Sequence, residues 1–197
     1  MDSGIDLMIP LNINFYISLL ITSLYFYIPG GSANIAAFFG MRVPLFKKLK
    51  TPVDFGLSIK GVRIIGDHKL LGGFLFGVFF GILMGIIKYL VLDNFMGNYV
   101  LLSLNFSQSL ILSFILAFFA VTGDVLKSIV KRLLNIPPHA PWIPFDEIDH
   151  SVTSLVAASV FFPIPIEVAL IIIVSSFLIH MFTNFVGFLL KIKSVPY

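Results

Sequence analysis

The sequence contains no cysteine and little charge. The absence of cysteine from all 197 residues excludes disulfide bonds, thiolate nucleophiles and cysteine-ligated zinc, so any metal must be held by oxygen or histidine. Charged residues make up 12% of the chain and hydrophobic residues 58%. Soluble domains contain about 25% charged residues and do not bury so much apolar surface. The sequence therefore predicts an integral membrane protein.

The motifs of several enzyme classes are also missing. There is no P-loop, no G-x-S-x-G nucleophile elbow and no H-E-x-x-H zinc motif. His68, His139 and His180 are far apart in sequence, which is typical of histidines that form hydrogen bonds rather than bind metal. The chemistry must therefore be inferred from clusters of other polar residues.

Five hydrophobic segments predict membrane-spanning helices, which need about 20 residues, although the fourth segment is shorter than this. They predict an all-α integral membrane protein with one domain over residues 1–197, because little chain is left for a soluble module. Pro29-Gly30-Gly31 is expected to end the first helix near Ile28, before a short apolar helix or re-entrant segment at 33–40. The expected spans are 11–28, 70–92, 100–121 with a helical extension to 134, 148–162 and 167–190.

Lysine and arginine are confined almost entirely to three segments. Twelve of the thirteen lie in the loops 41–69 and 123–147 and in the tail 191–197, and only Lys88 lies elsewhere. Basic residues in short loops favour the cytoplasm, so we expect an outside amino terminus, a cytoplasmic carboxyl terminus and a site that faces the cytoplasm from the cell membrane. The net charge of +3 is modest and one-sided, so we interpret it as a signal of membrane topology, and no nucleic-acid partner is expected. Asp2 and Asp6 precede the first span, which is therefore expected to be retained rather than removed as a signal peptide.

Glycine recurs every four residues along the second span, at Gly73, Gly77, Gly81 and Gly85. This spacing places small residues on one stripe of a helix, where a neighbouring backbone can approach closely. We interpret the stripe as a helix-packing surface rather than a ligand site.

Three polar clusters lie at the cytoplasmic ends of the expected spans, and the first is Gly66-Asp67-His68-Lys69. A carboxylate beside a lysine at the start of a helix can hold a metal-bound phosphate, because helix N-termini attract anions. Helix capping by Asp67 and membrane anchoring by Lys69 are alternative interpretations of the same pattern.

The second cluster lies on the helical extension of the third span. Asp124, Lys127, Ser128, Lys131 and Arg132 follow i, i+3, i+4, i+7 and i+8 spacing and so share one face. This composition suits an anionic ligand held through a divalent cation. The alternative is an interfacial helix that binds lipid head groups through its basic residues, although the carboxylate favours the first interpretation.

The third cluster, Asp146-Glu147-Ile148-Asp149-His150, lies where the fourth span begins. If the helix has started there, Asp146 and Asp149 are one turn apart and can bind one magnesium ion, or a pair bridged by phosphate oxygens. An acidic first turn also complements a helix dipole. Three acids so close together repel one another near a membrane, and a bound cation would relieve this repulsion.

The order of these segments resembles the CDP-archaeol synthase family, a group of small membrane cytidylyltransferases, over nearly the whole chain. Each segment alone is a weak match, but the ordered set is specific. The segments are Ala33-Asn34, Pro52-Val53-Asp54-Phe55-Gly56, Arg63 through Lys69, Gly123-Asp124 through Arg132, Asp146-Glu147-Ile148-Asp149, and His180 through Asn184 to Tyr197.

The resemblance implies Mg²⁺-dependent transfer of a cytidylyl group from CTP to a lipid phosphate, with release of pyrophosphate, in phospholipid biosynthesis. In the family the acceptor is the isoprenoid ether lipid phosphate 2,3-bis-O-geranylgeranylglycerol 1-phosphate, and the product is CDP-archaeol. The partners implied are thus CTP, this lipid and the lipid bilayer. No particular oligomeric state is predicted.

The resemblance also implies roles for individual residues. Asp124, Asp146 and Asp149 are expected to hold Mg²⁺ and, with Lys127 and Lys131, to form the catalytic group; Asp67 is a further metal candidate. The expected substrate-binding residues are Asn34, Asp54, Asp67, Lys69, Ser128 and Arg132.

The chain departs from the family pattern at Gly66-Asp67-His68-Lys69-Leu70, where the family usually has Gly-Asp-Gly-Lys-Thr. The metal carboxylates are retained, so the same reaction is expected while the lipid is left open. Another lipid phosphate, such as phosphatidic acid, is the first alternative. A small ion or solute transporter and a non-catalytic lipid-binding scaffold are the others.

Overall fold

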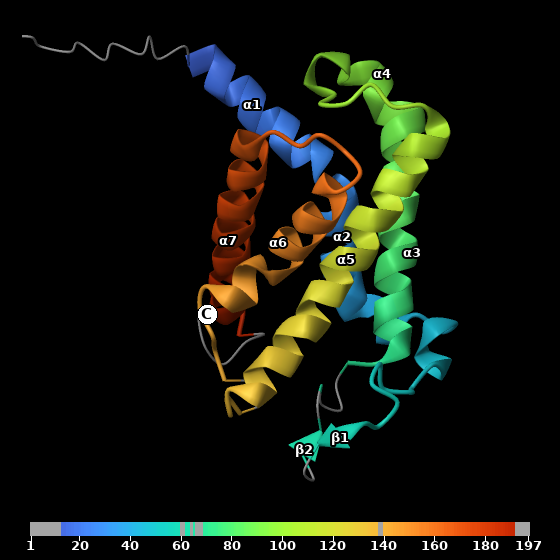
Figure 1. Cartoon of the computed structure of the whole chain (residues 1–197), viewed down its shortest axis with the longest axis vertical. Helices are drawn as coiled ribbons and strands as arrows, with labels where there is room; N and C mark the ends of the chain where they lie inside the picture. The colour runs from blue at the N-terminus through green and yellow to red at the C-terminus, as the bar shows by residue number, and fades with distance from the viewer. Residues whose placement is uncertain (1–12, 60–61, 64, 66–68, 138–139, 192–197) are drawn as a thin grey trace, which may run out of the picture.

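The protein is almost entirely helical (Figure 1). The computed structural model describes residues 13–59, 62–63, 65, 69–137 and 140–191. Within these residues, a short antiparallel pair of strands, β1 (Ser58–Ile59) and β2 (Val62–Arg63), accompanies the helices. The expected all-α class is confirmed apart from this small addition. The helices are α1 (Ile13–Phe26), α2 (Ile28–Phe39), α3 (Leu71–Ile87), α4 (Asp93–Phe95), α5 (Phe106–Leu133), α6 (Phe145–Ser159) and α7 (Ile166–Leu189).

Three helical segments in the described part of the chain are long and apolar enough to cross a membrane: Leu71–Phe95, Phe106–Leu133 and Ile166–Leu189. A fourth is formed if α1 and the helix after it, which are bent by 51°, count as one broken span. α6 has only 15 residues. Its length is about 22 Å, less than the hydrocarbon thickness of about 30 Å. Five spans, and the orientation of the two termini, therefore stay predictions.

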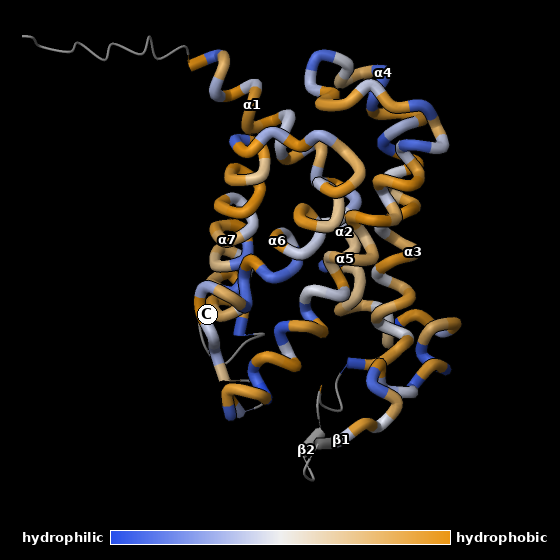
Figure 2. Tube along the Cα trace, in the orientation of Figure 1, coloured by the Kyte–Doolittle hydropathy of each residue, from blue (hydrophilic) through white to orange (hydrophobic). Residues whose placement is uncertain are grey.

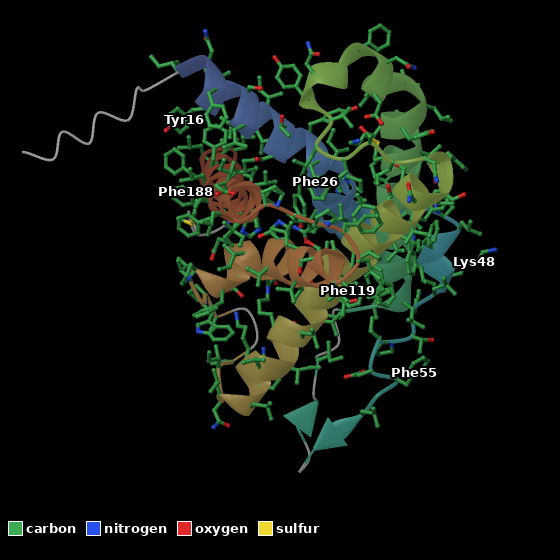
Figure 3. The ribbon with its side chains drawn as sticks, turned by 45° about the horizontal axis from the view of Figure 1, so that its top comes forward. Tyr16, Phe26, Lys48, Phe55, Phe119 and Phe188 are labelled. Atoms are coloured by element: carbon green, nitrogen blue, oxygen red, sulfur yellow. The ribbon has the colours of Figure 1, made fainter. Side chains whose placement is uncertain are left out.

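α5 crosses the centre of the bundle and contacts α2, α3 and α6. α2 and α3 pack on each other and on α5, α6 packs along α5, and α7 packs against α6 and α1 (Figure 1). The side chains of Leu116, Ala117 and Ala120 on α5 are completely buried. Figure 3 shows Phe119 where α5 meets α6. α5 is thus the helix on which the site is built.

The two ends of the bundle carry different residues. The loop between α2 and α3, the loop between α5 and α6 and the end of α7 all lie at one end, at the bottom of Figure 1. The turns between α4 and α5 and between α6 and α7 lie at the other. We call these the polar end and the far end, because hydrophilic residues gather on the last turns of α5 and the first turns of α6 (Figure 2). The segments predicted to share one compartment therefore share one end of the molecule.

α2 begins earlier than the sequence analysis expected. It starts at Ile28 rather than near Ala33, and Pro29 lies in its first turn. The first turn of a helix tolerates proline because its backbone nitrogen needs no intrahelical partner there. The proline therefore starts the second helix as well as ending the first.

α5 begins later than expected, at Phe106 rather than Val100. Asn105 and Gln108 form a capping box, in which each side chain accepts a hydrogen bond from the other residue's backbone N–H, at 2.9 and 3.0 Å. These bonds fix the start of the helix. Its continuation past the expected membrane boundary, to Leu133, is confirmed.

The glycine stripe of α3 packs as the sequence predicted. A Cβ atom placed on Gly81 would lie 2.5 Å from the Cβ of Ala117 and 2.8 Å from the Cβ of Ala33. One placed on Gly77 would lie 2.8 Å from the carbonyl oxygen of Ala33. α2, α3 and α5 therefore approach so closely that only glycine fits at these positions.

Candidate functional site

A cavity of about 820 Å³ lies at the polar end, lined by residues of α2, α3, α5, α6 and α7 and by the loop before α3. Its lining combines a charged cluster with apolar side chains. The apolar side chains include Ile35, Phe38, Met41, Phe74 and Val121. The predicted site residues in the lining are Asn34, Lys69, Asp124, Lys127, Asp146 and Asp149.

The ammonium group of Lys127 lies at the centre of three carboxylates. Its Nζ atom is 3.0 Å from Oδ1 of Asp124, 3.3 Å from Oδ1 of Asp146 and 2.9 Å from Oδ2 of Asp149. α6 begins at Phe145, so Asp146 and Asp149 lie one helical turn apart. The sequence analysis predicted this spacing if the helix started before these residues. α5 and α6 therefore bring the second and third clusters together.

The second oxygen of each carboxylate is bound by another group. This second contact fixes the orientation of each side chain, so that one oxygen of each faces the Lys127 ammonium. The contacts are Asp124 Oδ2 with the Lys69 ammonium, Asp146 Oδ2 with the Trp142 backbone N–H at 2.7 Å, and Asp149 Oδ1 with the His150 backbone N–H at 2.6 Å.

Asp149 is the most enclosed of the three carboxylates, with a side chain that is 8% exposed. Its Oδ2 atom is buried and lies 2.9 Å from the Lys127 ammonium. This ion pair holds the oxygen in place. A carboxylate oxygen has a further lone pair with which it can bind another partner.

Lys131 lies one turn beyond Lys127 on α5 and outside the cavity lining. Its ammonium donates to both carboxylate oxygens of Asp146 at 3.1 Å and to the carbonyl oxygen of Ala140 at 2.5 Å. These contacts fasten the loop between α5 and α6 and hold one carboxylate of the site. The geometry thus gives Lys131 a positioning role.

Three predicted binding residues form hydrogen bonds to nearby main-chain groups, and none of the three lines the cavity. Their predicted roles in binding substrate stay predictions. The bonds run from the Ser128 hydroxyl to the carbonyl oxygen of Asp124 at 2.8 Å, from Arg132 to the carbonyl oxygen of Ile136, and to Asp54 from the N–H groups of Gly56 at 3.0 Å and Ile65 at 3.3 Å.

The first cluster reaches the site through Lys69. Its ammonium donates a hydrogen bond to Asp124, which joins the start of α3 to the charged group of α5. Asp67 and His68 lie outside the described residues, so the predicted metal and substrate roles of Asp67 stay predictions.

Gly123 allows α6 to lie close to α5, and the sequence analysis did not identify this role. A Cβ atom at Gly123 would lie 2.6 Å from the carbonyl oxygen of Asp149 and still closer to the Thr153 hydroxyl. That hydroxyl lies 2.9 Å from the carbonyl oxygen of Phe119, across the two helices, and 2.6 Å from that of Asp149 in its own helix, so its one hydrogen is shared between the two. The sequence did contain a signal for this close approach: a glycine lies directly before Asp124, inside a predicted helix, where glycine is normally unfavourable.

Tyr27 holds α6 from another side, and no sequence motif marks it. It lies at the break between α1 and α2 and is buried. Its hydroxyl donates to the carbonyl oxygen of His150 at 3.0 Å and is 3.0 Å from the Ser154 hydroxyl. The bent helix pair is thereby tied to the turn of α6 that carries Asp149.

Mg²⁺ fits the chemistry of this site but not the present spacing of its oxygens. In the described part of the chain, no three Asp, Glu or His side chains are close enough together to hold a metal ion as they stand. Three carboxylate oxygens do face one position, at 2.9 to 3.3 Å from the Lys127 ammonium. Mg²⁺ prefers such ligands at about 2.0–2.1 Å. The donor set therefore suits this ion, provided that Lys127 leaves the central position.

Comparison with known proteins identifies relatives over most of the chain. The profile of the CarS-like family, CDP-archaeol synthase, matches residues 16–197. The CDP-archaeol synthase of Pyrococcus furiosus is 36% identical over 164 residues, which are 83% of this chain and 93% of that protein. The one from Methanocaldococcus jannaschii is 33% identical over 183 residues, 90% of this chain and 97% of that protein. The one from Pyrobaculum islandicum is 30% identical over 172 residues, 87% and 92% of the two chains.

A solved structure, that of an intramembrane enzyme for archaeal membrane lipids biosynthesis, has the same fold. The TM-score is 0.65, with 24% identity, over 82% of this chain and 91% of the other. With the apolar helices described above, this likeness shows a multi-pass membrane protein. Since the family profile and these relatives match nearly the full length, the chain belongs to the CDP-archaeol synthase family.

Proposed function

We propose that this protein transfers a cytidylyl group from CTP to 2,3-bis-O-geranylgeranylglycerol 1-phosphate, with Mg²⁺ as cofactor, to give CDP-archaeol and pyrophosphate. Family membership supports the reaction, and the observation that carries it in this chain is the mixed lining of the cavity. The charged part of the lining suits a nucleoside triphosphate with a cation, and the apolar part suits an isoprenoid chain. Charged groups gathered at one end, rather than at mid-depth, favour this enzyme over a transporter.

The proposed chemistry needs no covalent bond to the protein. An oxygen of the lipid phosphate attacks the α-phosphorus of CTP, and the bond from that phosphorus to the oxygen bridging it to the β-phosphorus breaks, which releases pyrophosphate. Catalysis then consists of positioning two anions and stabilising their charge. When bound, Mg²⁺ would neutralise phosphate oxygens. Asp124, Asp146 and Asp149 are the residues that would hold it.

The lysines of the site divide into two roles. Lys69 and Lys127 line the cavity and would contact phosphate groups of CTP and of the lipid. Lys131 lies behind them and would position Asp146 through its hydrogen bonds. Two of the lysines would thus bind substrate phosphates, and the third would hold a carboxylate of the site in position.

The lipid specificity tests the proposal directly. Detergent-purified protein is incubated with Mg²⁺, radiolabelled CTP and either the isoprenoid ether lipid phosphate or phosphatidic acid. We expect labelled CDP-lipid from the ether lipid at a rate at least about tenfold above that from phosphatidic acid, because the apolar lining selects the chains. Equal rates would contradict the proposed acceptor, and no labelled lipid from either would contradict the reaction.

The proposed cytoplasmic orientation can be tested with single cysteines, because the chain has none of its own. Lys48→Cys at the polar end and Asn98→Cys at the far end replace exposed residues. A membrane-impermeant maleimide should label Asn98→Cys on intact cells and Lys48→Cys only after lysis, since basic loops favour the cytoplasm. The reverse labelling would contradict this orientation.

A further inference from the structure

The position that all three site carboxylates face is already taken by a cation of the protein itself. Lys127 is the one described lysine in contact with Asp124, Asp146 and Asp149 together. The other two site lysines each bind one carboxylate: Lys69 binds the outer oxygen of Asp124, and Lys131 binds both oxygens of Asp146. Three carboxylates this close would repel one another without a central positive charge.

We propose that Lys127 is a built-in counter-ion, which occupies the position of a divalent cation among the three carboxylates and leaves it when the cation binds. The inference rests on the proposed function, because the cation is the one that cytidylyl transfer requires. Lys127 thus has two positions. One is among the carboxylates, and the other is in the cavity, toward the phosphates of the substrates.

The distances show why the ammonium and a divalent cation bind there in alternation. Lys127 Nζ lies 2.9 to 3.3 Å from the three oxygens. Mg²⁺ takes carboxylate oxygens at about 2.0–2.1 Å, so to bind the ion these three oxygens would have to close in on the position between them that the ammonium now holds. Two positive centres cannot share that space. Cation binding therefore requires that the ammonium moves.

The contacts of Lys127 also allow it to move. Its ammonium contacts each of the three carboxylates through one ion pair, and a divalent cation bound between them would replace all three contacts. The outer oxygens stay bound to Lys69, to the Trp142 N–H and to the His150 N–H, which keeps the carboxylates in place. The side chain lines a cavity of about 820 Å³. A flexible lysine has room there to contact an anionic phosphate.

The first test measures cation affinity without substrate. Binding of Mn²⁺ to detergent-purified wild type, Lys127→Met and Lys88→Met is followed by the electron paramagnetic resonance signal of free Mn²⁺. Lys127→Met should bind Mn²⁺ on the order of tenfold tighter than wild type, because the competing charge is gone. Lys88→Met removes a lysine of equal exposure that is paired with Asp93 at the far end, and it should stay within about threefold of wild type. No tightening in Lys127→Met, or equal tightening in both variants, would overturn the inference.

The second test uses the unaltered protein, so it does not depend on the folding of a variant. Lysine acylation followed by mass spectrometry compares the reactivity of Lys127 and Lys88 with and without Mn²⁺. Lys127 should become several-fold more reactive once released from the carboxylates, while Lys88, which is paired with Asp93 at the far end, stays unchanged. A Lys127 reactivity that does not respond to Mn²⁺ would overturn the inference.

The two tests are independent of turnover. A protein that shows both responses but forms no CDP-lipid would disprove the proposed function and leave the cation exchange intact. A protein that forms CDP-lipid, but in which Mn²⁺ does not change the reactivity of Lys127, would disprove the exchange alone.

Discussion

The polar end and the far end each contain a lysine paired with aspartate beside a cavity, but the two arrangements differ. At the far end, a cavity of about 410 Å³ is lined by Tyr25, Lys88 and Asp93. One oxygen of Asp93 accepts from the Tyr25 hydroxyl at 2.5 Å and from Lys88 at 3.0 Å, and the lysine lies 4.4 Å from the centre of the tyrosine ring. At the polar end, one lysine faces three carboxylates.

The difference indicates which of the two clusters binds a ligand. The far cluster pairs one carboxylate with one lysine and covers the lysine with an aromatic ring, so its charges satisfy one another. The π-helical stretch Lys88–Leu92 brings these partners, five residues apart, side by side. The far cluster thus fastens α3 to α1, whereas the polar cluster directs several oxygens at a position that a cation can take.

Removal of one carboxylate at each end should give the largest contrast. Asp149→Asn removes a charge that the proposed cation needs and should lower CDP-lipid formation by about a hundredfold to a thousandfold. Asp93→Asn, the matched change at the far end, should lower it by less than about threefold. Rates are measured with labelled CTP at equal amounts of folded protein. Similar losses in both variants would break the contrast between the ends.

Helix approach gives the next contrast. Gly123→Ala places a Cβ atom 2.6 Å from the Asp149 carbonyl oxygen and should lower the free energy of unfolding by about 1–3 kcal/mol through overpacking. Gly97→Ala at the far end meets no atom within 4 Å and should change it by less than about 0.5 kcal/mol. Unfolding is followed by circular dichroism in a denaturing-detergent titration. A stable Gly123→Ala would show that α5 and α6 are not in close contact there.

Two neighbouring tyrosines offer the smallest contrast. Tyr25→Phe and Tyr27→Phe each remove a hydroxyl that donates one hydrogen bond, and each should lower the free energy of unfolding by about 0.5–1.5 kcal/mol. Only Tyr27→Phe should also lower kcat, because its hydroxyl holds the turn of α6 that carries Asp149. Steady-state kinetics on both variants checks this. An equal effect of both changes on kcat would remove the positioning role of Tyr27.

The sequence was sufficient to locate most helices, because membrane spans follow from long apolar segments. Their boundaries depended on local chemistry that hydrophobicity does not report. Pro29 starts α2 as well as ending α1, and the Asn105–Gln108 capping box delays α5 to Phe106. An asparagine three residues before a glutamine was visible in the sequence, but the apolar residues ahead of it obscured the boundary.

The members of the charged cluster could be predicted, whereas its internal arrangement could not. Helical spacing placed Asp124 with Lys127, and Asp146 with Asp149, on common faces. The position of Lys127 between the two pairs depends on how α6 packs on α5, and that packing depends on Gly123. Contacts made by backbone N–H groups, such as that of Trp142, leave no trace in a residue pattern.

The dependence of catalysis on a divalent cation tests the central claim most directly. Wild-type protein is stripped with EDTA and assayed with labelled CTP and the isoprenoid ether lipid phosphate, before and after Mg²⁺ is restored. We predict no CDP-lipid in EDTA and full recovery with Mg²⁺, because three carboxylates directed at one position bring the anionic substrates together only through a cation. CDP-lipid formation at the same rate in EDTA would contradict the account.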